Sequence, residues 1–358
     1  MSSLEFVFST NLSKDSDILY NIQCFHSEGL SPKYGLTPEG GLPKLSRIYG
    51  PSPNSKEGNY ERKGSNTQMK QSPIGVFDSG IGGLTVLREI TSLLPFESTI
   101  YLGDTARVPY GSKSKETIER YSFEIARFLQ RLGVKMLVAA CNTASAYAVP
   151  RLAKELDIPV LGVIEPGART AVAATRERRI GVIGTEGTIK SNSYVNAIKR
   201  LCDGGAFEIV EHGKKSFDRY FEVKPGNDVV IFTKACPLFV PLVEEGWTDD
   251  AVTRIVAERY LTGLKDERID TLVLGCTHYP LLKNTISSVM GAGVSLIDSA
   301  ESTAAEVKKT LAAAGLLSDS KKASHRFFVT DSPERFMTVG RRFFGDRLES
   351  SELAVLSE

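Results

Sequence analysis

The feature that most constrains the fold is an alternation of short apolar segments with amphipathic ones, which begins near Ser72. Helical patterns are expected at 115–131, at 145–156 and around 189–201. Strands are expected at 74–78, 99–104, 135–141, 159–164, 179–184, 270–276 and 294–298. Continuously apolar strands that alternate with helices are typical of parallel sheets covered on both faces. The pattern therefore predicts an α/β fold built from doubly wound parallel sheets.

Two of the predicted strands end in similar sequences. LVAACNTAS at 137–145 and LVLGCTHYP at 272–280 are each an apolar strand followed by a cysteine, polar residues and a turn. In parallel sheets the ligand crevice lies outside the carboxyl ends of the strands. We therefore expect two similar α/β units that face each other across a central cleft, with Cys141 and Cys276 on opposite sides of it.

The setting of these two cysteines favours chemistry over packing. A thiol beside a helix N-terminus lies where backbone N–H groups stabilise an anion. The pKa of a free cysteine is about 8.5, so a modest lowering makes the thiolate available as a base near neutral pH. A single strand cysteine is more often a packing residue. Here the pairs Asn142-Thr143 and Thr277-His278 follow the cysteines, and their polar groups suit an amino acid's α-carboxylate and ammonium.

A glycine-rich turn, DSGIGGLTV at 78–86, follows the first predicted strand. It fails the dinucleotide-binding pattern because Thr85 stands where the third glycine is required. The backbone N–H groups of the turn, together with Ser79, suit a bound carboxylate, and Asp78 suits the orientation or acceptance of a proton. The alternative for Asp78 is a helix cap.

Two further loops follow predicted strands. RVPYGSKS at 107–114 offers the hydroxyl of Tyr110 and the N–H of Gly111 to a ligand, or is simply a turn. In GTEGTIKS, Thr185 and Thr188 are candidate ligands and equally good helix caps.

Composition limits the classes of partner. Lys and Arg total 44 and Asp and Glu total 43, which gives a net charge of +1, so nothing favours nucleic acid or an anionic membrane surface. No apolar run reaches the roughly 18–20 residues of a membrane span, and the first thirty residues do not resemble a secretory signal. Five scattered cysteines without a C-x-x-C pair fit reduced thiols, which favours a cytoplasmic location. The four histidines show no zinc-ligand spacing, so no metal site is expected.

Two segments depart from the regular pattern. Residues 1–71, rich in Gly, Pro, Ser, Asn and Lys after Gly29, are expected to be a disordered extension. Translation from Met69 and a genuine extension are both compatible with this composition. Residues 203–234 form an apparent insertion before ACPLFVPLVEEGW.

Several motifs together resemble the glutamate racemases of the aspartate/glutamate racemase family. FFVTDSPERFMTVGRRFFG at 327–345 is similar to the C-terminal segment of that family, and the match covers roughly three quarters of the chain. The other motifs lie in order between about Ile74 and Leu282: DSGIGGLTV, ARVPYGSKS, ACNTASA, GVIEPG, GTEGTIKSNSY, ACPLFVPLVEEGW and LGCTHYPLL.

This resemblance implies two α/β domains with the active site between them. Residues 73–165 and 280–348 would form the first domain and residues 166–279 the second. It implies two catalytic cysteines, Cys141 and Cys276, which act as paired acid and base without pyridoxal phosphate, metal or another cofactor. Asp78 would assist the first, and Glu244 and His278 the second. The implied substrate-binding residues are Asp78, Ser79, Tyr110, Gly111, Asn142, Thr143, Thr277 and His278.

The resemblance further implies interconversion of L- and D-glutamate, which supplies peptidoglycan synthesis and thereby cell-wall biogenesis and cell shape. Two alternatives remain open. One is a racemase of aspartate or another amino acid, because aspartate racemases share the cysteine pair. The other is a catalytically inactive amino-acid-binding protein. The sequence leaves the oligomeric state open, a homodimer included.

Overall fold

The computed structural model describes residues 69–203, 208–213, 219–224 and 229–356. Most of the predicted extension 1–71 therefore lies outside the described residues, and its last three residues, 69–71, have helical backbone. Among the described residues, none of the helices has the length and apolar character that a bilayer-spanning segment needs.

The first sheet contains six strands in the order β12-β11-β2-β1-β3-β4, all paired in parallel. Its strands are β1 (Ile74–Asp78), β2 (Thr99–Gly103), β3 (Met136–Ala139), β4 (Val160–Gly162), β11 (His325–Val329) and β12 (Glu352–Leu353). Strands β1, β2 and β3 are buried along their whole length, as the continuously apolar segments predict for a sheet covered on both faces.

The second sheet combines the predicted parallel strands with an antiparallel edge. Its order is β10-β9-β5-β8-β7-β6, and only β10, β9, β5 and β8 pair in parallel. The apparent insertion at 203–234 supplies β6 and β7, which pair antiparallel because the connections are too short for a crossover. The strands are β5 (Arg179–Gly184), β6 (Glu208–Gly213), β7 (Arg219–Lys224), β8 (Val229–Ala235), β9 (Thr271–Gly275) and β10 (Ser295–Asp298).

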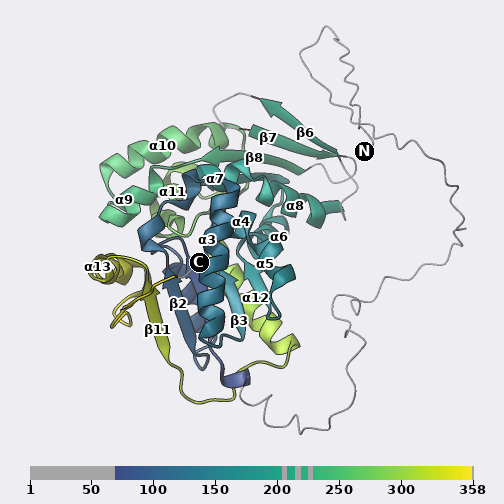
Figure 1. Ribbon diagram of the computed structural model, residues 1–358. Coiled ribbons are helices and arrows are strands. Elements are labelled where there is room, and N and C mark those ends of the chain that lie inside the picture. Colours follow the sequence, from purple (N-terminus) through teal and green to yellow (C-terminus); the bar gives the residue numbers. More distant parts are fainter. Residues whose placement is uncertain (1–68, 204–207, 214–218, 225–228, 357–358) are drawn as a thin grey trace, which may run out of the picture. The chain divides into compact units, whose positions relative to one another are not determined.

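Helices flank both sheets (Figure 1). They are α2 (Leu84–Leu93), α3 (Lys115–Arg131), α4 (Asn142–Tyr147), α5 (Val149–Glu155), α6 (Ile164–Ala174), α7 (Glu186–Lys190), α8 (Ser193–Asp203), α9 (Phe239–Glu245), α10 (Ala251–Asp266), α11 (Lys283–Met290), α12 (Ser299–Ala313) and α13 (Pro333–Phe344). Short 3-10 turns are η2 (Thr105–Arg107), η3 (Tyr110–Ser112) and η4 (Tyr279–Leu282).

Two helices that the sequence predicts as continuous are each broken in two. The helix expected at 145–156 begins earlier, at Asn142, and is interrupted at Ala148, next to Pro150 in the first turn of α5. Proline lacks the N–H that would continue the preceding helix. The helix expected around 189–201 is interrupted at Asn192, whose φ of 54° is left-handed.

The prediction that the first domain resumes at residue 280 also needs correction. Strand β10 pairs with β9, so the chain remains in the second sheet until Asp298, because α11 returns it alongside the strand it has just left. The chain rejoins the first sheet at β11. Helix α12 lies between these strands and packs against both α2 and α6. One apolar cluster includes Val138 of β3 and Leu274 of β9, so the two sheets share a continuous core.

Candidate active site

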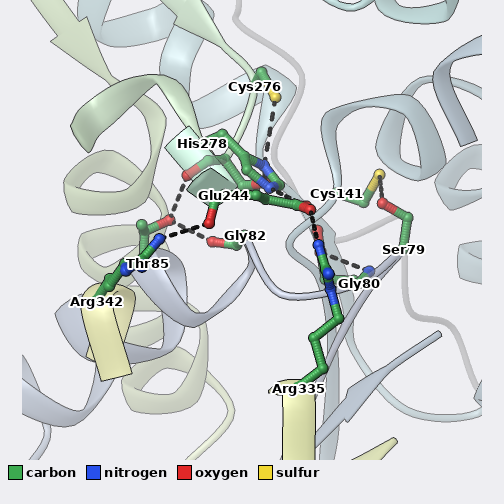
Figure 2. A network of polar contacts seen from close by, with 12 residues as sticks. Ser79, Gly80, Gly82, Thr85, Cys141, Glu244, Cys276, His278, Arg335 and Arg342 are labelled. Carbon is green, nitrogen blue, oxygen red and sulfur yellow. Dashed lines mark hydrogen bonds and ion pairs between the residues drawn. The ribbon is translucent and has the colours of Figure 1, made fainter. Parts of the chain in front are cut away.

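Both conspicuous cysteines lie at the carboxyl ends of central strands. Cys141 follows β3 and Cys276 directly follows β9, and each is only 6% exposed. The sulfur of Cys141 caps α4, because it accepts a hydrogen bond from the Ala144 N–H at 3.5 Å. The two cysteines are close enough for a charge on Cys276 to raise the pKa of Cys141 after the larger effects of burial and Asp78. Figure 2 shows both in one close view.

The Cys141 side contains a buried carboxyl group. The Cys141 Sγ donates to Ser79 Oγ at 3.6 Å, and Asp78 Oδ2 accepts from the Gly80 N–H at 2.9 Å. Burial raises the pKa of Asp78. Burial, followed by the charge of Asp78, raises the pKa of Cys141 to about 12. Burial and Asp78 therefore outweigh the lowering of the Cys141 pKa that was expected from the helix N-terminus. With this raised pKa, Cys141 is a neutral thiol near neutral pH.

The Cys276 side contains a charged histidine. His278 Nδ1 lies 3.9 Å from Cys276 Sγ, and His278 Nε2 lies 3.1 Å from Glu244 Oε1. Burial alone would lower the pKa of His278, but the contacts with Cys276 and Glu244 outweigh it and raise that pKa to about 10. The hydrogen bond with His278 lowers the pKa of Glu244. An imidazolium therefore lies beside the Cys276 sulfur near neutral pH.

The two sides meet through the glycine-rich turn after β1. A Cβ added to Gly82 would collide with Thr277 Oγ1 and His278 Nδ1, so only glycine permits this approach. The Thr85 hydroxyl, one turn further on, donates to the Thr277 carbonyl at 3.1 Å. Asp78 also interacts electrostatically with His278. The structure thus brings the predicted residues of both strand ends into one site.

Hydroxyl groups line another part of the site. Thr143 Oγ1 lies 2.9 Å from Thr185 Oγ1 and 3.2 Å from Thr188 Oγ1. A Cβ on Gly187 would lie 3.0 Å from both the Gly111 carbonyl oxygen and Thr143 Cγ2. Gly111 and Thr143 of the first sheet's loops therefore lie against the Thr185 turn of the second.

Tyr110 lies in the same loop as Gly111, but its hydroxyl points elsewhere. It is buried and donates to Asp104 Oδ2 at 2.5 Å. Asp104 also accepts from Arg107 Nε at 2.7 Å and from Thr330 Oγ1 at 2.8 Å. Tyr110 therefore anchors the loop, and its hydroxyl proton is already committed to Asp104.

Two buried polar atoms at the site have no hydrogen-bond partner among the described residues: Asp78 Oδ1 and Asn142 Nδ2. The other amide atom of Asn142, Oδ1, accepts from the Tyr194 hydroxyl at 2.8 Å. One free acceptor and one free donor match the needs of an ammonium group and a carboxylate.

Sequence reasoning missed several residues that support the site. Tyr194 lies in the first turn of α8, and the tyrosine in GTEGTIKSNSY was the only signal for it. Helix α13 contributes Arg342, which donates to the Glu244 carbonyl at 2.6 Å, and Arg335, 3.7 Å from Glu244 Oε2 (Figure 2). Phe343 packs edge-on against the His278 ring at 5.3 Å. No local pattern could link the two arginines of α13 to a glutamate more than ninety positions away.

Metal binding finds no support in the described ranges. They contain no group of three or more His, Cys, Asp or Glu side chains placed to hold a metal ion.

Comparison with known proteins agrees with this geometry. The family model described as Asp/Glu/Hydantoin racemase matches residues 74–307. The chain belongs to the Asp/Glu/Hydantoin racemase family. A glutamate racemase of Geobacter metallireducens is 53% identical over 281 residues, which cover 78% of this chain and 95% of that protein.

Solved structures of this racemase family share the fold. A glutamate racemase of Bacillus anthracis is 41% identical with a TM-score of 0.71, and the match covers 80% of this chain and 98% of that one. A glutamate racemase of Francisella tularensis, solved in complex with D-glutamate, is 35% identical with a TM-score of 0.69 and covers 80% and 99%. The two-domain α/β architecture predicted from the sequence is confirmed, apart from the antiparallel edge of the second sheet.

Proposed function

We propose that the protein interconverts L- and D-glutamate by moving the α-proton between two cysteines, Cys141 and Cys276. The observation that carries this proposal is the pair of buried thiols at matched strand ends, with one beside a carboxylate and the other beside an imidazolium. The reaction needs a base on one face of the α-carbon and an acid on the other.

The groups beside the two thiols suit one direction of the reaction directly. Positively charged His278 lies 3.9 Å from the Cys276 sulfur, where a positive charge suits a base that acts as an anion, while the raised pKa of Cys141 suits a proton donor. The Cys276 thiolate removes the α-hydrogen as a proton, the electron pair remains on the α-carbon, and the Cys141 thiol gives its proton to the opposite face. The centre is then inverted, Cys276 is a thiol and Cys141 a thiolate. The other enantiomer reacts from that second state.

The substrate's charged groups would be held by the polar atoms that lack partners. Asn142 Nδ2 is a donor for the α-carboxylate, and Asp78 Oδ1 is an acceptor for the ammonium group. The hydroxyls of Thr143, Thr185 and Thr277 provide further contacts. Donors fixed in a water-poor site stabilise the negative charge that develops as the α-proton leaves.

We assign glutamate as the substrate because relatives named glutamate racemase match nearly their whole length at up to 53% identity. The proposed mechanism draws on no pyridoxal phosphate or metal, since two thiols and their neighbours supply both proton transfers. The proposed role is supply of D-glutamate to peptidoglycan.

Proton exchange in D₂O tests this proposal. L-glutamate or D-glutamate incubated with the enzyme alone should acquire deuterium at the α-carbon and lose optical purity, followed by NMR and chiral chromatography. Aspartate in a parallel reaction separates the two racemase readings. Folded protein that exchanges neither glutamate enantiomer would refute the function, and faster turnover of aspartate would reassign the substrate.

A further inference from the structure

We propose that Tyr194 is a positioning residue for substrate binding: it fixes the Asn142 side-chain amide so that its NH₂ group points at the substrate carboxylate. This inference rests on the proposed function, because it concerns how the same site holds glutamate. It assigns a task to a buried tyrosine that takes no part in the proton transfers.

A buried hydrogen bond from Tyr194 orients the Asn142 amide. Tyr194 is 2% exposed, and its hydroxyl donates to Asn142 Oδ1 at 2.8 Å. An amide oxygen accepts and an amide NH₂ group donates, so in this hydrogen bond Asn142 presents its oxygen to Tyr194. Its nitrogen is thereby directed away from the tyrosine.

The nitrogen directed in this way is the buried Asn142 Nδ2 that has no partner among the described residues. It follows Cys141 in the chain, at the first position of α4. An amide rotated by half a turn would present its oxygen to the substrate instead. Two acceptors, an amide oxygen and a carboxylate, would then face each other in a buried site, which is unfavourable. Tyr194 therefore ensures that the NH₂ group of Asn142, and not its amide oxygen, faces the substrate carboxylate.

Tyr194 belongs to the second sheet's helices, whereas Asn142 follows a strand of the first sheet. The Tyr194 ring also lies against the Cys276 strand, since a Cβ on Gly275 would be 3.2 Å from Tyr194 Cε2. One side chain thus connects the end of the Cys276 strand with a ligand-binding atom beside Cys141. The orientation of Asn142 is supplied from the opposite side of the site.

The test is Tyr194→Phe, which removes one oxygen and keeps the ring. We expect KM for both glutamate enantiomers to rise roughly 10-fold with kcat nearly unchanged. The reason is that Asn142, no longer held by Tyr194, loses its hydrogen bond to the charged substrate carboxylate. Calorimetric Kd for D-glutamate should weaken by the same factor, and Tm should stay close to the wild type. Tyr147→Phe is the matched control, since the Tyr147 hydroxyl likewise joins helices of the two sheets, by donating to the Gly187 carbonyl of α7 at 3.1 Å. Its KM should stay close to the wild type.

A double-mutant cycle separates positioning from general packing. Asn142→Ala alone should raise KM at least as much as Tyr194→Phe, and the double variant should be no worse than Asn142→Ala. An unchanged KM and Kd in Tyr194→Phe, or an equal further loss in the Asn142→Ala background, would overturn the inference. Failure of the wild type to racemise would instead refute the proposed function, and the calorimetric Kd series would still test Tyr194.

Discussion

Cys141 and Cys276 follow strands of similar sequence, but the groups that surround the two thiols differ. Both thiols end a buried strand, and both are 6% exposed. Yet Cys141 lies beside a carboxyl group that raises its pKa, and Cys276 lies beside a histidine that is positively charged. Matched strand ends therefore place the two sulfurs, whereas the charged groups beside them differ.

The two sides also differ in what supports them. Helix α13 supports the Cys276 side, through Arg342 and Arg335 on Glu244 and through Phe343 on the His278 ring. The Arg88 guanidinium donates to the Phe343 carbonyl at 3.1 Å and ties the end of α13 to α2. The Cys141 side depends instead on short-range contacts with Ser79 and Asp78 of the neighbouring strand end. The charged histidine thus needs a scaffold from the far end of the chain.

The largest effects should come from the groups beside the thiols. We expect His278→Asn and Asp78→Asn each to lower kcat/KM about 100-fold, the scale of a lost acid–base partner. The enantiomers are equally stable, so kcat/KM must fall equally in both directions. The ratio of the two kcat values should nevertheless shift in opposite senses in the two variants. Steady-state kinetics from each enantiomer measures this, and shifts in the same sense would contradict two distinct sides.

Removal of the α13 support should have the next largest effect. Arg342→Ala removes the donor to the Glu244 carbonyl and lets Glu244 and His278 move, so we expect kcat to fall roughly 10-fold. Arg341→Ala is the control, because it removes the same charge from the next, exposed position of α13. Steady-state assays of both variants provide the comparison. An equal loss in Arg341→Ala would show that charge, and not the Arg342 contact, is responsible.

The charged state of His278 predicts a pH dependence of stability. Its pKa in the folded protein, about 10, is above the ordinary value of 6.5. Protonation therefore stabilises the fold fully below about pH 6.5, and this contribution is lost as pH rises toward 10. Glu244→Gln removes an anion that raises the His278 pKa, so the decline should be shallower. Urea unfolding between pH 6.5 and 10 measures both slopes. Parallel slopes in the two proteins would argue against a charged His278.

The smallest effect should come from Arg335. Its side chain is 62% exposed and lies 3.7 Å from Glu244, and exposed ion pairs of this kind contribute about 0–1 kcal/mol. We expect Arg335→Ala to change kcat by less than about twofold, and the residual effect should vanish at high salt. A loss as large as that of Arg342→Ala would mean that the carboxylate, not the backbone, is where α13 holds Glu244.

The sequence predicted the strands that carry the site more accurately than the elements that support it. Strands β1 and β5 have the predicted bounds, because fully buried parallel strands are continuously apolar. The turn after each strand was also recognised, so the main polar residues of the site were named. The neutral Cys141 and the charged His278 were not foreseen, because burial and partners from distant segments decide them.

Other errors have equally local causes. The antiparallel strands β6 and β7 lie within 203–234, which was described only as an apparent insertion, with no strands assigned to it. Glu244 has no local signal of its own, and only the family resemblance placed it beside Cys276; in the structure it contacts His278 and α13. Contacts between segments far apart in the chain leave no periodic signal in either one.

The most direct test of the two-cysteine account is α-proton exchange in D₂O by Cys141→Ser and Cys276→Ser, each started from L- and from D-glutamate. We expect each substitution to lower racemisation about 1000-fold or more, since a serine hydroxyl replaces neither thiol nor thiolate at this site. Residual exchange should persist from one enantiomer only, and from the opposite enantiomer in the two variants. Wild-type racemisation in either variant, or exchange of the same enantiomer in both, would contradict the account.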